Sequence, residues 1–290
     1  MKKNRVTDLQ KGDNFLSGKI CMVTGANSGI GKAAATAFAK VGATTVLVCR
    51  DEKKGRAAQE EIKALTSNRS VELLLVELSS LDSVRKLAAD FKQEHSQLNV
   101  LVNNAAVVEG SRVVTKDGLE EVFVVNYLSQ FLLTNLLLDE LKSSAPARIV
   151  NVTSSVHAHI DFDDLQMEKG YNAIKSYGQS KLAQILFTQE LAKRLAGSGV
   201  TANCVHPGAV RTHLGDEGGI VGIGIKLLRP FYMSPEKGAE TLVYVATSPQ
   251  VEGISGKYFY KKKQRSLLEN ESDAKRLWEI SMKLSGLQSQ

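Results

Sequence analysis

The sequence of 290 residues contains few cysteines and no long apolar run. Its three cysteines, Cys21, Cys49 and Cys204, lie in or beside apolar stretches and lack metal-ligand spacings such as C-x-x-C. We therefore predict buried, reduced strand residues, a cytoplasmic protein and no metal site. Apolar runs such as 131–138 are broken by polar residues and fall short of the ~20 residues that span a bilayer. No apolar stretch follows the basic residues at the amino terminus, so neither a secretory signal nor a membrane span is expected.

The charge balance is only mildly basic, with 37 Lys and Arg against 31 Asp and Glu. Part of the excess gathers at the two ends, in 1–5 and 257–290, without the interleaved aromatic residues that stack nucleic-acid bases. A solvated surface is therefore favoured over a nucleic-acid site. Lys261–Lys263 could instead attract an anionic membrane surface, and that alternative stays open. Hydrophobic residues make up 43% and charged residues 23% of the chain, which excludes disorder, collagen and coiled coil as descriptions of the whole.

Short β-branched runs alternate with helix-period segments along the whole chain, the pattern of repeated βα units and a parallel sheet. The clearest helical period lies in 84–91, after the possible cap Ser80. Runs such as 46–49 are apolar throughout, which indicates burial on both faces and hence helices on both sides of the sheet. We predict one doubly wound, three-layer α/β domain over 1–290. Its strands are 20–24, 45–49, 71–77, 100–103, 148–153, 201–205 and 257–260.

One segment, 213–235, breaks this alternation, because it is glycine-rich and then strongly apolar. It follows the end of a strand, where ligands bind in open α/β sheets. We therefore predict a lid that closes over a substrate. An amphipathic helix with a flexible entry is the alternative.

A glycine-rich turn joins the first predicted strand to the first helix, in Thr24-Gly-Ala-Asn-Ser-Gly-Ile-Gly31. Glycines at such a place allow a tight turn and a close approach of the backbone to a pyrophosphate, whose charge then meets the helix N-terminus. A glycine cluster alone is a weak signal. In the first strand–turn–helix unit of a βα repeat it favours a dinucleotide site over a structural turn.

Tyr177 and Lys181 stand four residues apart at the predicted start of a helix, and so share one helical face. A tyrosine with a pKa near 10 is a poor base, and a neighbouring ammonium lowers that pKa by stabilising the phenolate. Such a pair could exchange a proton with an alcohol or a carbonyl group. Because Y-x-x-x-K is common by chance, the pair alone carries little weight.

The glycine spacing after a strand-terminal threonine, together with the Tyr-Lys pair, resembles the short-chain dehydrogenase/reductase superfamily. That resemblance implies a Rossmann fold with a seven-stranded parallel sheet and an active site of Asn126, Ser155, Tyr177 and Lys181. Ser155 is preferred to Ser154 because adjacent strand residues face opposite sides and because the family pattern points to the second serine. Asn126, within a predicted long helix over 117–142, would hold a backbone kink and a water that leads to the lysine.

The resemblance also implies a set of residues that bind a nicotinamide dinucleotide. The turns after five strands and the two catalytic side chains on the helix supply them. The set is Gly25, Asn27, Ser28, Gly29, Ile30, Gly31, Arg50, Lys54, Glu77, Leu78, Asn104, Ala105, Tyr177, Lys181, Pro207, Gly208, Val210 and Thr212. Glu77 and Ala106 depart from the family pattern, which usually has Asp and Gly there.

Arg50 ends the second strand where an acid would accept the ribose hydroxyls of NAD. A guanidinium there favours a 2′-phosphate, so we predict NADP(H) as the preferred cofactor. Asp51 is the counter-argument, because a shift of one residue would bring its carboxylate to the ribose. Use of NAD(H) therefore stays possible.

The resemblance covers about residues 16 to 285 and extends to the retinol-dehydrogenase-like branch through 49–55, 181–192 and 274–281. Membrane members of that branch carry an N-terminal apolar anchor. No such stretch is found in this sequence, so we expect a soluble, microbial relative. The implied function is NADP(H)-dependent hydride transfer between nicotinamide and a small hydrophobic aldehyde, ketone or alcohol. A nucleotide-sugar epimerase or dehydratase and a non-catalytic NADPH-binding redox sensor are the alternatives. Relatives often pair the 117–142 and 177–196 helices, so a homo-oligomer, dimer or tetramer, is expected.

Overall fold

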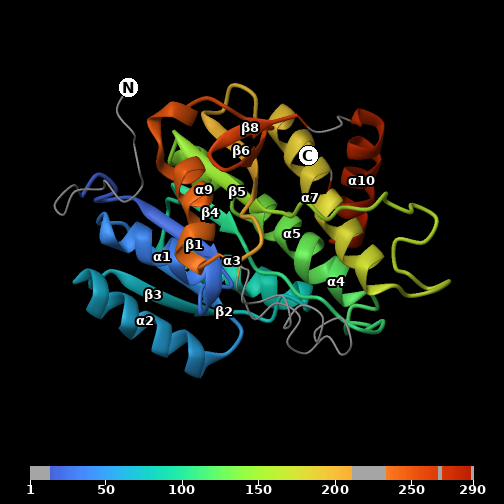
Figure 1. The fold of residues 1–290 in the computed structure, drawn as a ribbon, viewed down its shortest axis with the longest axis horizontal. Helices are drawn as coiled ribbons and strands as arrows, with labels where there is room; N and C mark the ends of the chain where they lie inside the picture. Colours follow the sequence, from blue (N-terminus) through green and yellow to red (C-terminus); the bar gives the residue numbers. More distant parts are fainter. Residues whose placement is uncertain (1–13, 211–232, 267–269, 289–290) are drawn as a thin grey trace.

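Eight strands form one sheet in the computed structural model, which describes residues 14–210, 233–266 and 270–288 (Figure 1). The strands lie in the order β3-β2-β1-β4-β5-β6-β7-β8, and all neighbours are parallel except β7 and β8. They are β1 (Ile20–Thr24), β2 (Thr44–Cys49), β3 (Val71–Leu75), β4 (Val100–Asn103), β5 (Ala147–Val152), β6 (Val200–His206), β7 (Tyr258–Tyr260) and β8 (Lys263–Arg265).

Helices cover both faces of the sheet. They are α1 (Gly29–Lys40), α2 (Glu52–Thr66), α3 (Leu81–Glu94), α4 (Glu121–Phe123), the π-helix η2 (Val124–Leu128), α5 (Ser129–Leu136), α6 (Leu138–Ser143), α7 (Ala173–Arg194), α9 (Pro235–Thr247), the short 3₁₀ helix η4 (Pro249–Val251) and α10 (Glu271–Leu284). Polar residues begin several of them. The side chains of Asp51, Ser80 and Asn172 accept hydrogen bonds from backbone N–H groups of α2, α3 and α7.

The two largest hydrophobic clusters, one on each face of the sheet, explain the three layers. Along β1, Met22 packs into the cluster that contains α3, α5 and α7, whereas Cys21 and Val23 pack into the cluster that contains α1 and α9. Because successive strand residues point to opposite faces, a strand that is apolar throughout must be covered on both sides. The doubly wound α/β/α fold predicted from the sequence is confirmed. The three cysteines are buried in β1, β2 and β6 and unpaired, also as predicted.

The strand order reverses at β1, which lies between β2 and β4. Connections from β1 and from β4 leave toward opposite faces, so a crevice forms outside their carboxyl ends, where open α/β sheets bind ligands. The glycine turn follows β1, and Asn104 and Ala105 follow β4. The fold therefore brings two predicted binding segments to one edge of the sheet.

The structure corrects the sequence prediction in three elements. An eighth, antiparallel strand β8 extends the predicted seven-stranded sheet through a turn at Lys261 and Lys262, both with positive φ. The predicted helix over 117–142 is broken into α4, the π-helix η2, α5 and α6. The helix of Tyr177 begins at Ala173, one turn earlier than predicted. Of the predicted lid over 213–235, residues 213–232 lie outside the described part of the chain.

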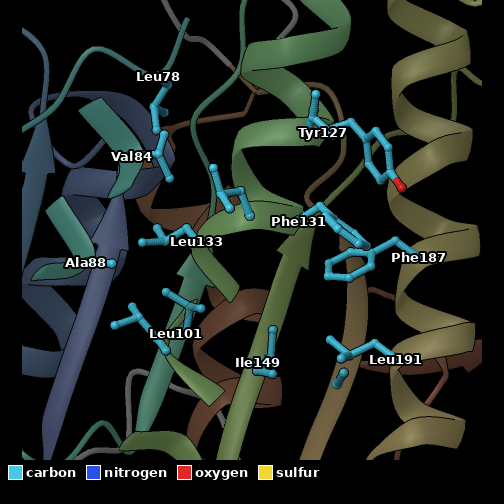
Figure 2. Packing of buried hydrophobic residues seen from close by; sticks show 14 of the residues in the cluster. Leu78, Val84, Ala88, Leu101, Tyr127, Phe131, Leu133, Ile149, Phe187 and Leu191 are labelled. Atoms are coloured by element: carbon cyan, nitrogen blue, oxygen red, sulfur yellow. The ribbon is translucent and has the colours of Figure 1, made fainter. Parts of the chain in front are cut away.

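Helix α10 lies alongside α7, on the outer side of the helical layer that contains α3, α5 and α7 (Figure 1). Figure 2 shows Phe131 of α5 and Phe187 of α7 side by side in the cluster beneath it. The ring of Trp278 in α10 lies 5.0 Å from the ring centre of Phe131 and 5.9 Å from that of Phe187. The faces of α5 and α7 that carry these rings are therefore covered within one chain.

Candidate active site

The turns after β1 and β4 are joined by the side chains of Thr24 and Asn104. The backbone N–H groups of Asn104 and Ala105 donate to Thr24 Oγ1 at 2.9 and 3.1 Å. Asn104 Nδ2 donates back to the Thr24 carbonyl at 2.8 Å. These bonds fix the position of the predicted adenine-side residues against the glycine turn. Thr24 itself is fully buried, and sequence reasoning did not assign it a role.

The glycine turn has the backbone geometry that only glycine adopts easily. Gly25 and Gly29 have φ values of +65° and +55°. At Gly31 a Cβ atom would lie 2.4 Å from the Gly25 carbonyl oxygen and 2.5 Å from Asn104 Nδ2, so helix α1 could not approach the turn as closely. The side chain of Ser28, the N-cap of α1, makes no capping hydrogen bond. Ser28 therefore leaves the first-turn N–H groups of α1 available, and such groups suit a pyrophosphate.

Arg50 and Asp51, which follow β2, differ in their interactions. Asp51 Oδ1 accepts a hydrogen bond from the Lys54 N–H at 2.9 Å and caps α2, and Lys54 Nζ lies 3.9 Å from the same carboxylate. Arg50 is exposed, and within the described ranges no hydrogen bond or ion pair engages its guanidinium. The Asp51 carboxylate caps α2, whereas the neighbouring Arg50 guanidinium is available to a ligand.

Two further turns carry predicted cofactor residues. After β3, Glu77 Oε1 accepts hydrogen bonds from the N–H and the hydroxyl of Ser79 at 3.2 and 2.9 Å, and Leu78 is buried. After β6, Gly208 has a φ of +89° and would meet the Met233 side chain if it carried a Cβ. Val210 pairs with Met233, and Thr212 lies outside the described residues.

Tyr177 and Lys181 lie one turn apart on α7, with Lys181 Nζ 5.5 Å from the centre of the tyrosine ring. Lys181 is 2% exposed and donates to the Val152 carbonyl at 3.1 Å and to Gln184 Oε1 at 3.0 Å. Burial lowers the pKa of Lys181 to about 7, and the nearby Cys204 opposes this shift. Burial raises the pKa of Tyr177 to about 12, and a side-chain hydrogen bond with Ser154 opposes that rise. Tyr177 and Lys181 are therefore adjacent, as predicted. The hydrogen bonds of the Lys181 ammonium, however, go to the Val152 carbonyl of β5 and to Gln184 rather than to the phenol.

The structure favours Ser154 as the serine beside the phenol, whereas the sequence prediction placed Ser155 there. Strand β5 ends at Val152, so the alternation of faces on which the prediction relied no longer applies to residues 154 and 155. The chain turns instead, with Ser154 Oγ accepting the Val156 N–H at 3.1 Å. The hydroxyl group of Ser154, which is half-buried, lowers the pKa of Tyr177, whereas Ser155 is exposed.

Asn126 lies at the middle of the π-helix η2 and is fully buried. Its side chain accepts from the Val107 N–H at 2.7 Å and donates to the Val107 carbonyl at 3.0 Å. It also donates to Ser180 Oγ at 3.1 Å, and Ser180 donates to the Tyr177 carbonyl. A π-helical turn interrupts the helix at this asparagine, where the resemblance implied a kink, and Asn126 is bonded to Ser180, the neighbour of Lys181.

The structure thus gathers Asn126, Ser154, Tyr177 and Lys181 beyond the carboxyl end of β5. Sequence reasoning missed two residues of the surroundings, Gln130 and Gln184, which are each 1% exposed. The available signal was the spacing, since Gln184 follows Lys181 by three residues and shares its face of the helix.

Comparison with known proteins identifies the family. A family model described as short chain dehydrogenase matches residues 19–219. The chain belongs to the short-chain dehydrogenase family. Within it the dehydrogenase is similar to human retinol dehydrogenase 13, at 45% identity over 286 residues, which cover 94% of this chain and 86% of that protein. Human retinol dehydrogenase 14 is 42% identical over 312 residues, with coverage of 98% and 91%.

Solved structures share the fold of this dehydrogenase. An uncharacterised protein from Mycobacterium paratuberculosis matches with a TM-score of 0.77 and 30% identity, covering 98% of this chain and 97% of that one. A short chain dehydrogenase from Shigella flexneri, complexed with NADP, matches with a TM-score of 0.67 and 24% identity over 85% and 98% of the two chains. The family model and the identity of 42–45% to the retinol dehydrogenases make the dehydrogenase an oxidoreductase of the retinol-dehydrogenase-like branch. In the described ranges, none of its helices combines the length and apolar character that crossing a bilayer requires.

Proposed function

We propose that the dehydrogenase is an NADP(H)-dependent enzyme that interconverts a hydrophobic aldehyde or ketone and the corresponding alcohol, with Tyr177 as the acid/base. The observation that carries this proposal is the position of the buried Lys181 one helical turn from Tyr177, with its Nζ atom 5.5 Å from the centre of the phenol ring. The names of the retinol dehydrogenases support a hydrophobic alcohol or aldehyde as the substrate class.

When bound, the nicotinamide supplies or accepts the hydride. In the direction of reduction, Tyr177 gives its phenolic proton to the carbonyl oxygen of the substrate. Ser154 donates a hydrogen bond to the same oxygen and orients it. The charged Lys181 makes loss of that proton easier, because an ammonium stabilises a phenolate. Asn126 holds the helix kink and bonds to Ser180, next to the lysine, and so supports the return of the proton.

The preference for NADP(H) rests on Arg50 and Asp51. Because one oxygen of the Asp51 carboxylate caps α2, that side chain is less available to a cofactor ribose, and Arg50 would be the charge that meets the 2′-phosphate. The dinucleotide would lie on the glycine turn, along Asn104 and Ala105, with the nicotinamide toward Pro207 and Gly208. NAD(H) is the alternative cofactor.

The test follows the absorbance of the reduced cofactor with a panel of aliphatic and aromatic aldehydes, ketones and retinoids. We expect net oxidation of NADPH by at least one hydrophobic carbonyl compound, and Tyr177→Phe should lower kcat by roughly 10²- to 10⁴-fold with cofactor binding retained. Wild-type turnover in Tyr177→Phe contradicts the assignment. Product without net cofactor oxidation would indicate an epimerase or dehydratase, and binding without turnover would indicate a sensor.

A further inference from the structure

A chain of buried amide side chains extends from Lys181 to the turn after β4. Lys181 Nζ donates to Gln184 Oε1 at 3.0 Å, Gln184 Nε2 donates to Gln130 Oε1 at 2.6 Å, and Gln130 Nε2 donates to the Ala105 carbonyl at 2.9 Å. The chain crosses from α7 to α5 and then to the loop after β4. Ala105 is in turn bonded to Thr24 at the glycine turn.

The chemistry of the two ends fixes the direction of every bond in this chain. A lysine ammonium can only donate hydrogen bonds, and a backbone carbonyl can only accept them. Gln184 must therefore present its oxygen to Lys181 and its nitrogen to Gln130, and Gln130 must do the same toward Ala105. With both glutamines 1% exposed, bulk water cannot replace a lost partner. The arrangement specifies one orientation for each amide.

We infer that Gln184 and Gln130 are positioning residues for Lys181, whose ammonium they hold through an amide chain anchored on the backbone of the predicted cofactor turn. This inference rests on the proposed function, which assigns Lys181 its role. Gln184 supplies one of the two acceptors of the ammonium, and the Val152 carbonyl supplies the other. Gln130 supports the site through Gln184. Its Oε1 accepts the hydrogen bond from Gln184 Nε2, which would otherwise be buried without an acceptor.

The surroundings of Lys181 make that acceptor important for its charge. Burial already lowers the pKa of the lysine to about 7, so its ammonium is only marginally retained near neutral pH. Among the described residues, the titratable groups that face it are Tyr177 of the same helix and Cys204 of β6. Neither is an anion at neutral pH, because burial raises the pKa of both groups. The neutral oxygen of Gln184 thus accepts a hydrogen bond from the ammonium and stabilises its charge, as a carboxylate does in an ion pair.

The experiment titrates Lys181 directly, by the NMR signal of its Cε in protein that carries isotope-labelled lysine. Disappearance of the signal in Lys181→Arg assigns it. In Gln184→Leu we expect the midpoint to fall by about one to two pH units, because a hydrogen bond to the charged form is lost. Gln130→Leu should shift it in the same direction by less. Gln184→Glu should keep it at the wild-type value or raise it, because either form of the carboxyl group offers an acceptor.

Gln179→Leu is the matched control. Gln179 is also on α7 and 2% exposed, but its two hydrogen bonds go to the Asp161 N–H and the Leu165 carbonyl. The inference is overturned if Lys181 in Gln184→Leu titrates at the wild-type pH, or if the control moves it equally. Should the single variant fail to fold, the double variant Gln130→Leu/Gln184→Leu replaces both amides by apolar groups and permits the same measurement.

The titration needs no turnover, so its failure is distinct from failure of the proposed function, which Tyr177→Phe tests. A second readout links the two. A less charged Lys181 stabilises the Tyr177 phenolate less, so the rising limb of kcat for alcohol oxidation should move to higher pH in Gln184→Leu. A merely structural role would lower kcat equally at every pH and leave the limb in place.

Discussion

Among single residues, the choice between two adjacent serines has the most direct consequence for catalysis. Ser154 is close enough to Tyr177 to lower the pKa of its phenol, and Ser155 is exposed. We expect Ser154→Ala to lower kcat by roughly 10²- to 10³-fold, as loss of a donor to the reacting oxygen does elsewhere. Ser155→Ala should stay within about twofold of wild type. Steady-state kinetics of the two variants with one carbonyl substrate decide the matter, and the reverse order would restore the sequence prediction.

The cofactor preference is also a property of one side chain. Arg50→Ala should reduce kcat/KM for NADPH by roughly 10- to 100-fold and leave the value for NADH nearly unchanged, because only NADPH carries the 2′-phosphate. Arg56→Ala is the control, since Arg56 is equally cationic but bonds to Glu52 on the surface of α2. A tenfold or greater preference of the wild-type enzyme for NADH would refute the assignment.

Among whole elements, those determined by a few neighbouring residues could be predicted from the local sequence pattern. Strand β1 and the N-terminal cap of α3 at Ser80 were predicted as found, because apolar runs and capping side chains act within a few residues. Strand β8 was missed because Lys263, Gln264 and Arg265 are all exposed. An edge strand held by backbone pairing with β7 leaves no apolar alternation to read.

Elements shaped by distant contacts could not be predicted in detail. The break in the helix over 117–142 falls at Asn126, whose side chain bonds to Val107, 19 residues earlier in the chain. The family resemblance indicated a kink, but the residues alone do not specify a π-helix. The same limit applies to Gln130 and Gln184, whose side chains are 54 residues apart in sequence and meet only in the folded chain. The candidate site was therefore predictable in its motif residues and not in the contacts that support them.

At the scale of the whole molecule, α10 changes the expectation for assembly. The family resemblance led us to expect an oligomer that pairs the helices over 117–142 and 177–196, but Trp278 packs on Phe131 and Phe187, and Ser281 bonds to Tyr127 at 2.6 Å. We expect α10 to be an integral layer, so that any homo-oligomer forms through another surface.

This expectation is tested by removing the aromatic side chain through which α10 packs on Phe131 and Phe187. Trp278 is 7% exposed, and the guanidinium of Arg194 lies 4.2 Å from its ring centre. Trp278→Ala should lower the free energy of unfolding by about 3–5 kcal/mol, as truncation of a buried aromatic residue does. The measurement is urea unfolding, with the exposed neighbour Glu279→Ala expected within about 0.5 kcal/mol of wild type. If both variants unfold at the wild-type urea concentration, α10 is not part of the core, and the faces of α5 and α7 become available for pairing with a second copy.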